Sequence, residues 1–74
     1  MLRLTEDEVY KIIMFRESFR SIEECNTYFR NTFGEEAYSL VKSWWDNHYL
    51  CINTCEYVTL TRLGLRHVLG DNYV

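Results

Sequence analysis

Three stretches of the chain place apolar residues at the spacing of one helix face. A first helix is expected over about residues 6–15 or 16, a second over 22–29 or 30, and a third, the longest, over 33–47 or 48. A short extended segment is expected between the first two helices. The apolar faces consist of Val9, Ile12 and Ile13 in the first helix, Ile22, Cys25 and Phe29 in the second, and Ala37, Leu40, Val41, Trp44 and His48 in the third.

Each of these helices is preceded by a capping signal. A Ser or Thr is followed three residues later by a Glu, and the two side chains can satisfy the free N–H groups of the first turn. The pairs are Thr5 and Glu8, Ser21 and Glu24, and Thr32 and Glu35. The third pair predicts that residues 30–36, RNTFGEE, form a turn between the second and third helices.

The segment after the third helix alternates between apolar and polar residues, which predicts β-strands. If Ile52 opposes Val58 and Leu50 opposes Leu60, all four side chains share one face of an antiparallel hairpin. The tip of the hairpin then consists of Thr54, Cys55 and Glu56.

A fourth helix is expected over residues 62–69, directly after the second strand. Thr61 can cap its first turn, and Gly70 stands where a glycine commonly ends a helix. The whole pattern predicts a mainly α fold with one small β-hairpin. It forms a single domain over residues 1–74, with the core in about 5–70 and a tail at 71–74.

The composition is typical of a folded protein in a reducing compartment. Hydrophobic residues make up 47% of the chain, and there is no Pro, so disorder is not expected. No apolar run approaches the length of a membrane span, and the N-terminus lacks the apolar centre of a signal peptide. The three cysteines are an odd number, which argues against a disulfide framework. A cytoplasmic location is expected.

The charge is acidic. A net charge of −3 weighs against strong non-specific DNA affinity, because that affinity comes from Lys and Arg neutralising phosphates. Most of the eight basic residues are arginines, however, and arginine suits bidentate contacts with phosphate or guanine. The charge therefore lowers the expectation of a nucleic-acid ligand without excluding it.

No arrangement of catalytic or metal-binding residues is expected. The acids cluster in first helical turns, where capping explains them, and the three glycines are isolated and form no phosphate-binding loop. His48, Cys51 and Cys55 are close in sequence, but their spacing differs from that of zinc knuckles. We expect no enzyme activity, metal, cofactor or small-molecule substrate.

The segment Val58, Thr59, Leu60 and Thr61, followed by Gly64, resembles the end of the wing in MarR-like and related winged helix-turn-helix proteins. The resemblance covers about residues 5–70. It implies the order helix, short strand, helix, helix, two-stranded wing, helix. It also implies that the third helix enters the DNA major groove while the wing contacts the adjacent backbone.

Carried over to this chain, the resemblance implies a DNA-binding surface on the third helix, the turn before it and the wing tip. The implied DNA-binding residues are Arg30, Asn31, Ser39, Lys42, Ser43, Asn53 and Thr54. The chain departs from the pattern, because the outward face of the third helix holds one Lys and three acids, and the wing carries Glu56 with no basic residue. A DNA-reading helix and a solvated polar face both remain open.

Three aromatic residues, Tyr38, Trp45 and Tyr49, lie beside the core face of the third helix. Two interpretations are open. The rings pack partly buried under the wing or against the first helix, or they form an exposed patch for a protein partner or for self-association. The residues that could extend such a patch are Tyr10, Met14 and Tyr73.

Two functions follow from the resemblance and the charge. The first is a small non-catalytic regulator of transcription that binds double-stranded DNA as a homodimer, because one module contacts few phosphates. The second is an acidic winged-helix module that binds another protein and not DNA, similar to phage or mobile-element accessory or inhibitor proteins. The first is slightly favoured because winged-helix domains usually bind DNA.

Overall fold

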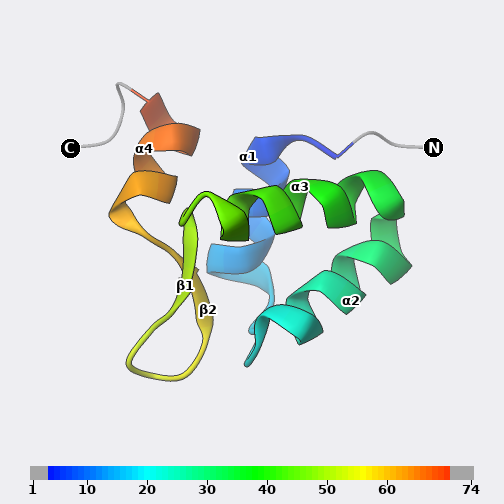
Figure 1. Ribbon diagram of the computed structural model, residues 1–74, viewed down its shortest axis with the longest axis horizontal. Helices are drawn as coiled ribbons and strands as arrows, with labels where there is room; N and C mark the ends of the chain where they lie inside the picture. Colours follow the sequence, from blue (N-terminus) through cyan, green and yellow to red (C-terminus); the bar gives the residue numbers. More distant parts are fainter. Residues whose placement is uncertain (1–3, 71–74) are drawn as a thin grey trace.

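Helices make up most of the computed structural model, which describes residues 4–70. Figure 1 shows α3 crossing α1 in the view, with α2 below it on the right and the hairpin and α4 on the left. The elements in chain order are α1 Glu6–Lys11, the π-helical turn η1 Ile12–Arg16, α2 Ile22–Phe33, α3 Glu35–Asp46, β1 Leu50–Ile52, β2 Val58–Leu60 and α4 Arg62–Leu69. The predicted mainly α fold with a small antiparallel hairpin is confirmed, and the expected tail at 71–74 lies outside the described residues.

The first helical segment widens after α1 into the π-helical turn η1. The N–H of Glu17 donates to the carbonyl of Ile12, five residues back, at 2.9 Å. The side chains of Ile12 and Ile13 are only 2% and 4% exposed, whereas Phe15 is 72% exposed. The expected span and apolar stripe are confirmed, but the segment is not one continuous α-helix.

Gly34 alone separates α2 from α3. Its φ of 100° and ψ of −175° lie in a region that glycine adopts and other residues avoid. The two helices meet at this residue: its N–H donates to the carbonyl of Arg30 at 2.9 Å, and its carbonyl accepts from the N–H of Tyr38 at 3.2 Å. The chain therefore reverses direction within one residue.

The prediction of a turn over residues 30–36 is wrong. The second helix continues to Phe33, and the third begins at Glu35 without a side-chain cap from Thr32. The physical reason is packing, because the ring of Phe33 stacks on that of Phe29 with 5.9 Å between centroids. Burial of this aromatic pair extends α2 past the local capping signal.

The end of α3 also differs from the expectation. The helix stops at Asp46, and His48 has a left-handed φ of 62° and is exposed, so its predicted place on the apolar helix face is wrong. The side-chain amide of Asn47 donates to the carbonyl of Ser43 at 2.9 Å. The same carbonyl also accepts from the backbone N–H of Asn47 at 2.9 Å, so two N–H groups of Asn47 close the last turn of the helix.

The core draws on every helix except α4 and on both strands. Trp44, Phe29, Val9, Val41 and Cys25 are its largest fully buried side chains. The other buried apolar residues are Ile12, Ile13, Phe19, Ala37, Leu50, Val58 and Leu60. Most of the predicted apolar faces are thus confirmed, with Ile22 and Leu40 half-buried at the edge.

The hairpin has the predicted register, with Leu50 opposite Leu60 and Ile52 opposite Val58. Three of these side chains are buried, but Ile52 is 42% exposed, so the expectation that all four face the core is only partly right. The N–H of Val58 donates to the carbonyl of Phe19 at 2.7 Å. The extended segment before α2 therefore holds the hairpin at the first residue of β2.

The junction between β2 and α4 is held by side-chain and backbone hydrogen bonds. The hydroxyl of Thr61 accepts from the N–H of Gly64 at 3.0 Å and donates to the carbonyl of His48 at 2.6 Å. The N–H of Thr61 donates to the carbonyl of Tyr49 at 2.9 Å. A Cβ atom on Gly64 would lie 2.2 Å from that same carbonyl oxygen, so only glycine fits.

We predict that Gly64→Ala lowers the free energy of unfolding by about 1–3 kcal/mol, because the added methyl group forces α4 away from the backbone of Tyr49. Urea denaturation followed by circular dichroism measures the change. Arg66→Ala on the exposed side of the same helix is the control and should alter stability by less than about 0.5 kcal/mol. Equal stability of the Gly64 variant and the control would contradict the close approach.

The three cysteines should differ in reactivity. Burial, with the Glu24 carboxylate adding to it, raises the pKa of the Cys25 thiol to about 12, so this thiol stays protonated at neutral pH. A thiol-specific disulfide reagent should therefore react with Cys51 and Cys55 and reach Cys25 only after denaturant is added. The Cys51→Ser, Cys55→Ser double variant should show no native reactivity. Reaction of Cys25 in the native double variant would contradict its burial.

Candidate functional site

The side of α3 that faces away from the core is polar and acidic. Its exposed residues are Glu35, Glu36, Ser39, Lys42, Ser43 and Asp46, which we call the α3 face. The opposite side of the helix is anchored by Val41 and Trp44, which are 0% and 1% exposed. The core thus fixes which residues α3 presents to a ligand, and it presents three carboxylates and one amine.

Arg30 is held against the start of α3. Its Nε lies 3.0 Å from Oε1 of Glu35, and its guanidinium carbon lies 3.9 Å from the centre of the Tyr38 ring. The predicted placement of Arg30 and Asn31 in a turn is wrong, because both residues belong to the last turn of α2. The guanidinium of Arg30 is already engaged by a carboxylate and a ring, so a phosphate would have to compete for it.

The structure brings Ser39, Lys42 and Ser43 together on the α3 face at helical spacing. The hydroxyl of Ser43 accepts a hydrogen bond from the side-chain amide of Asn47 at 3.2 Å. Within residues 4–70, Lys42 makes no ion pair. Of the predicted contacts on this helix, Ser39 and Lys42 are therefore the most available to a ligand.

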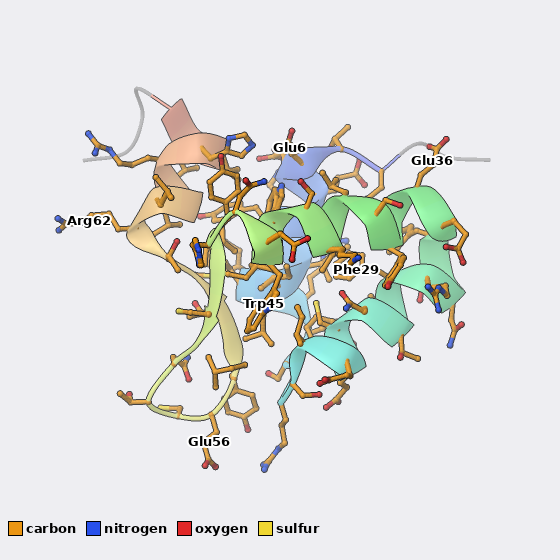
Figure 2. All side chains as sticks on the ribbon, in the orientation of Figure 1. Glu6, Phe29, Glu36, Trp45, Glu56 and Arg62 are labelled. Carbon is orange, nitrogen blue, oxygen red and sulfur yellow. The ribbon has the colours of Figure 1, made fainter. Side chains whose placement is uncertain are left out.

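The predicted wing-tip residues, Asn53 and Thr54, are both exposed. The side-chain oxygen of Asn53 accepts from the N–H groups of Cys55 at 2.9 Å and Tyr57 at 3.0 Å, so it shapes the loop. Figure 2 shows Glu56 at the end of the hairpin farthest from α3. The structure thus does not place the wing tip beside the α3 face, and the tip carries a negative charge.

The three predicted partner-binding aromatics make three separate contacts. Tyr38 lies under the guanidinium of Arg30, and Trp45 packs half-buried against the core. Tyr49 lies beyond the end of α3, where its ring stacks on His67 of α4 with 4.5 Å between centroids. None of these contacts joins two of the three rings. Of the residues that could extend the predicted patch, Tyr73 lies outside the described residues.

His67 also contacts the first helix. Its Nε2 lies within ion-pair distance of Oε2 of Glu6, and its ring lies edge-on to Trp44 at 6.2 Å between centroids. The contact joins α4 to α1 at the surface, since both side chains are exposed. The sequence gives no sign of this pair, because the two residues are 61 positions apart.

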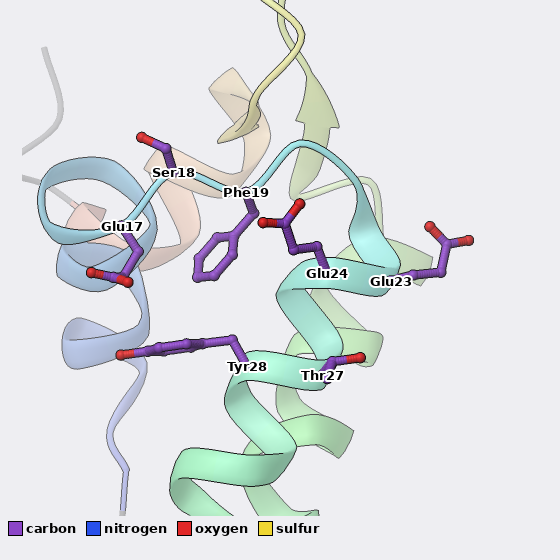
Figure 3. A pocket seen from close by; sticks show the side chains of 7 residues that line it. All are labelled: Glu17, Ser18, Phe19, Glu23, Glu24, Thr27 and Tyr28. Carbon is purple, nitrogen blue, oxygen red and sulfur yellow. The ribbon is translucent and has the colours of Figure 1, made fainter.

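A pocket of about 440 Å³ opens between the end of η1 and the first turns of α2. Figure 3 shows the residues that line it: Glu17, Ser18, Phe19, Glu23, Glu24, Thr27 and Tyr28. Sequence reasoning missed this site, because its walls come from two segments whose relative position only the fold defines. The available signal is the number of acids around Phe19 in the stretch from Glu17 to Glu24.

The described part of the chain holds neither a metal-binding group of side chains nor a helix that could span a membrane. Among residues 4–70, no three His, Cys, Asp or Glu side chains are grouped to hold a metal ion. In the same range, every helix is too short or too polar to cross a membrane. Comparison with protein-family models, curated proteins and solved structures finds no match to this chain.

We predict that Trp45→Ala lowers the free energy of unfolding by about 1–3 kcal/mol, because its half-buried ring loses apolar burial. Trp44→Ala, at a fully buried ring, should cost about 3–5 kcal/mol. Ser39→Ala on the α3 face is the control and should change stability little. Thermal and urea unfolding measure all three variants. A Trp45 variant as stable as the control would contradict the packing and favour an interface role for the ring.

Proposed function

We propose that the chain is a winged helix-turn-helix domain that binds a protein partner with a basic surface and carries out no catalysis. The fold part of the proposal is supported by the order of the elements, the hairpin register and the bond from Val58 to Phe19. The extended segment at Phe19 then stands where the resemblance implies a short first strand. The observation that carries the functional part is the charge of the α3 face.

The charges on the α3 face oppose DNA binding. A carboxylate placed about 4 Å from a phosphate repels it by ~1 kcal/mol even in water. Glu36 and Asp46 have no ion-pair partner among the described residues, and Lys42 is the one amine on this face. Non-specific DNA affinity grows with the number of phosphates that are neutralised, so one lysine supplies little of it.

The same charges favour a basic protein surface. Complementary charge steers a partner toward the face and increases the rate of association. The aromatic residues Tyr38, Trp45 and Tyr49 are engaged within the chain, so the proposal assigns the contact to the polar α3 face. The homodimer was predicted because DNA binding would need two half-sites. The protein-binding proposal does not require it, so it stays a prediction.

A regulator that binds double-stranded DNA is the second candidate. It is favoured by the exposure of Ser39 and Lys42 one turn apart on the helix that the resemblance places in the major groove. Arg62 and Arg66, both exposed on α4, could add contacts to the phosphate backbone. Figure 2 shows Arg62 pointing away from the body of the domain.

A DNA titration distinguishes the two candidates. We expect no binding of the wild-type protein to a labelled random-sequence duplex at low salt, where electrostatic attraction is greatest. The Glu36→Lys, Asp46→Lys double variant should gain salt-sensitive binding, because it reverses the charge of the α3 face. The control, Glu17→Lys with Glu23→Lys, has the same net charge and should gain much less. Fluorescence anisotropy measures binding in each case.

Wild-type binding that Lys42→Glu abolishes would contradict the proposal and support the DNA regulator. An equal gain in both double variants would show that net charge matters and the α3 face does not. The positive test is affinity capture with the wild-type protein, the Glu36→Lys, Asp46→Lys variant and an Asp7→Lys, Glu56→Lys control, whose two exposed acids lie outside the α3 face. A basic protein retained by the wild type and this control, but lost from the Glu36→Lys, Asp46→Lys variant, supports the proposed role of the face.

A further inference from the structure

The pocket between η1 and α2 has a rigid aromatic wall. Phe19 is 3% exposed, and its ring lies 5.2 Å from the ring of the half-buried Tyr28, measured between centroids. Tyr28 in turn packs edge-on against the buried Phe29 at 5.4 Å. These contacts hold the Phe19 and Tyr28 rings in place before any ligand arrives, which lowers the entropy cost of binding.

Three carboxylates surround this wall. Glu17 belongs to the extended segment, while Glu23 and Glu24 belong to the first turn of α2. Figure 3 shows Glu17 and the hydroxyl of Tyr28 toward one end of the pocket, Glu24 beside Phe19, and Glu23 at the opposite end. A ligand in the pocket would therefore meet negative charge on both sides of an apolar surface.

No basic side chain of the described chain neutralises these carboxylates. The ion pairs found in residues 4–70 involve Lys11, Arg30 and His67, and none of them includes an acid of the pocket. Arg20 stands between the acids in sequence, but its guanidinium carbon lies 5.5 Å from the ring centre of Tyr57 on the hairpin. Glu24 accepts a bond from the backbone N–H of Arg20 at 3.2 Å, which caps α2.

We propose that this pocket binds an arginine side chain presented by a partner protein. The planar guanidinium can stack on an aromatic wall while its N–H groups donate to carboxylates, and its aliphatic stem can cover apolar surface. Glu17, Glu23 and Tyr28 supply the carboxylates and the ring. The pocket is a second binding surface beyond the α3 face. It extends the proposed protein-binding function, and its test does not depend on that face.

An NMR titration with a defined probe tests the proposal. The probe is the peptide acetyl-Gly-Arg-Gly-amide, and the control is the same peptide with citrulline, which keeps the shape of arginine and lacks its charge. The arginine peptide should shift the backbone amides of residues 17–19 and 23–28 with millimolar affinity that weakens as salt is added. The citrulline peptide should cause little shift at the same concentration.

The variant Glu17→Gln with Glu23→Gln should raise the Kd of the arginine peptide roughly tenfold. Each exposed ion pair between a carboxylate and the guanidinium lowers the Kd by a factor of about three. Glu24 is left intact because it caps α2. Glu35→Gln with Glu36→Gln, on the α3 face, is the matched control and should leave the Kd unchanged. The amide spectrum of each variant shows whether the fold is retained.

Three outcomes would contradict the proposed binding of arginine. They are no shift of the amides of residues 17–19 and 23–28, equal shifts with the citrulline peptide, or an affinity that the Glu17 and Glu23 substitutions do not change. Shifts that gather on α3 would also overturn it. These results are separate from the test of the proposed function. Binding of duplex DNA through Lys42 would contradict the protein-binding role of the α3 face. It would not change the result expected from the titration with the arginine peptide.

Discussion

The close approach of α4 to the backbone at Tyr49 is the contact that holds the carboxyl-terminal third of the domain in place. Each strand of the hairpin has three residues, which is too short for a two-stranded ribbon to be stable alone. Thr61 fixes the base of the ribbon through the carbonyls of His48 and Tyr49, and Gly64 lets the helix pack directly on that backbone. The bond from Val58 to Phe19 secures β2 farther along. β2 is thereby held at both ends, by the extended segment at Phe19 and by the start of α4.

This anchoring determines which surfaces remain free. The hairpin and α4 pack on the side of α3 that carries Trp44, so the opposite side is left to solvent with its carboxylates. The extended segment that meets β2 also positions Phe19 beside α2 and so creates the acidic pocket. Both candidate surfaces thus follow from the same packing, and both are negative. A basic protein partner is consistent with each, whereas a phosphate backbone is attracted by neither.

Much of the fold could be predicted because the signals are local. The period-two alternation gave the hairpin register, and the capping residues Thr5, Ser21 and Thr61 marked real helix starts. The break between α2 and α3 was predicted, but with too many residues and too early a start, because Thr32 carries a local capping signal that the packing of Phe33 overrides. The π-helical turn was missed because five residues are too few to distinguish its period from that of an α-helix.

The candidate site was predicted less well than the fold, for a physical reason. The outward residues of α3 follow from helix periodicity and were identified correctly, as Ser39 and Lys42 show. The engagement of Arg30 by Glu35, and the stacking of Tyr49 on His67, depend on contacts between segments that no sequence period reveals. The pocket at Phe19 also depends on how two separate segments pack together, so no sequence period reveals it.

Hydrogen exchange of single backbone amides tests the anchoring of the hairpin most directly. If the ribbon unfolds only together with the helices, the amides of Val58 and Thr61 should exchange with the same opening free energy as that of Val41 in the core of α3. The amide of Thr54, at the exposed tip, should exchange much faster. Exchange of Val58 and Thr61 as fast as Thr54 would show a hairpin that opens by itself and would contradict the anchoring.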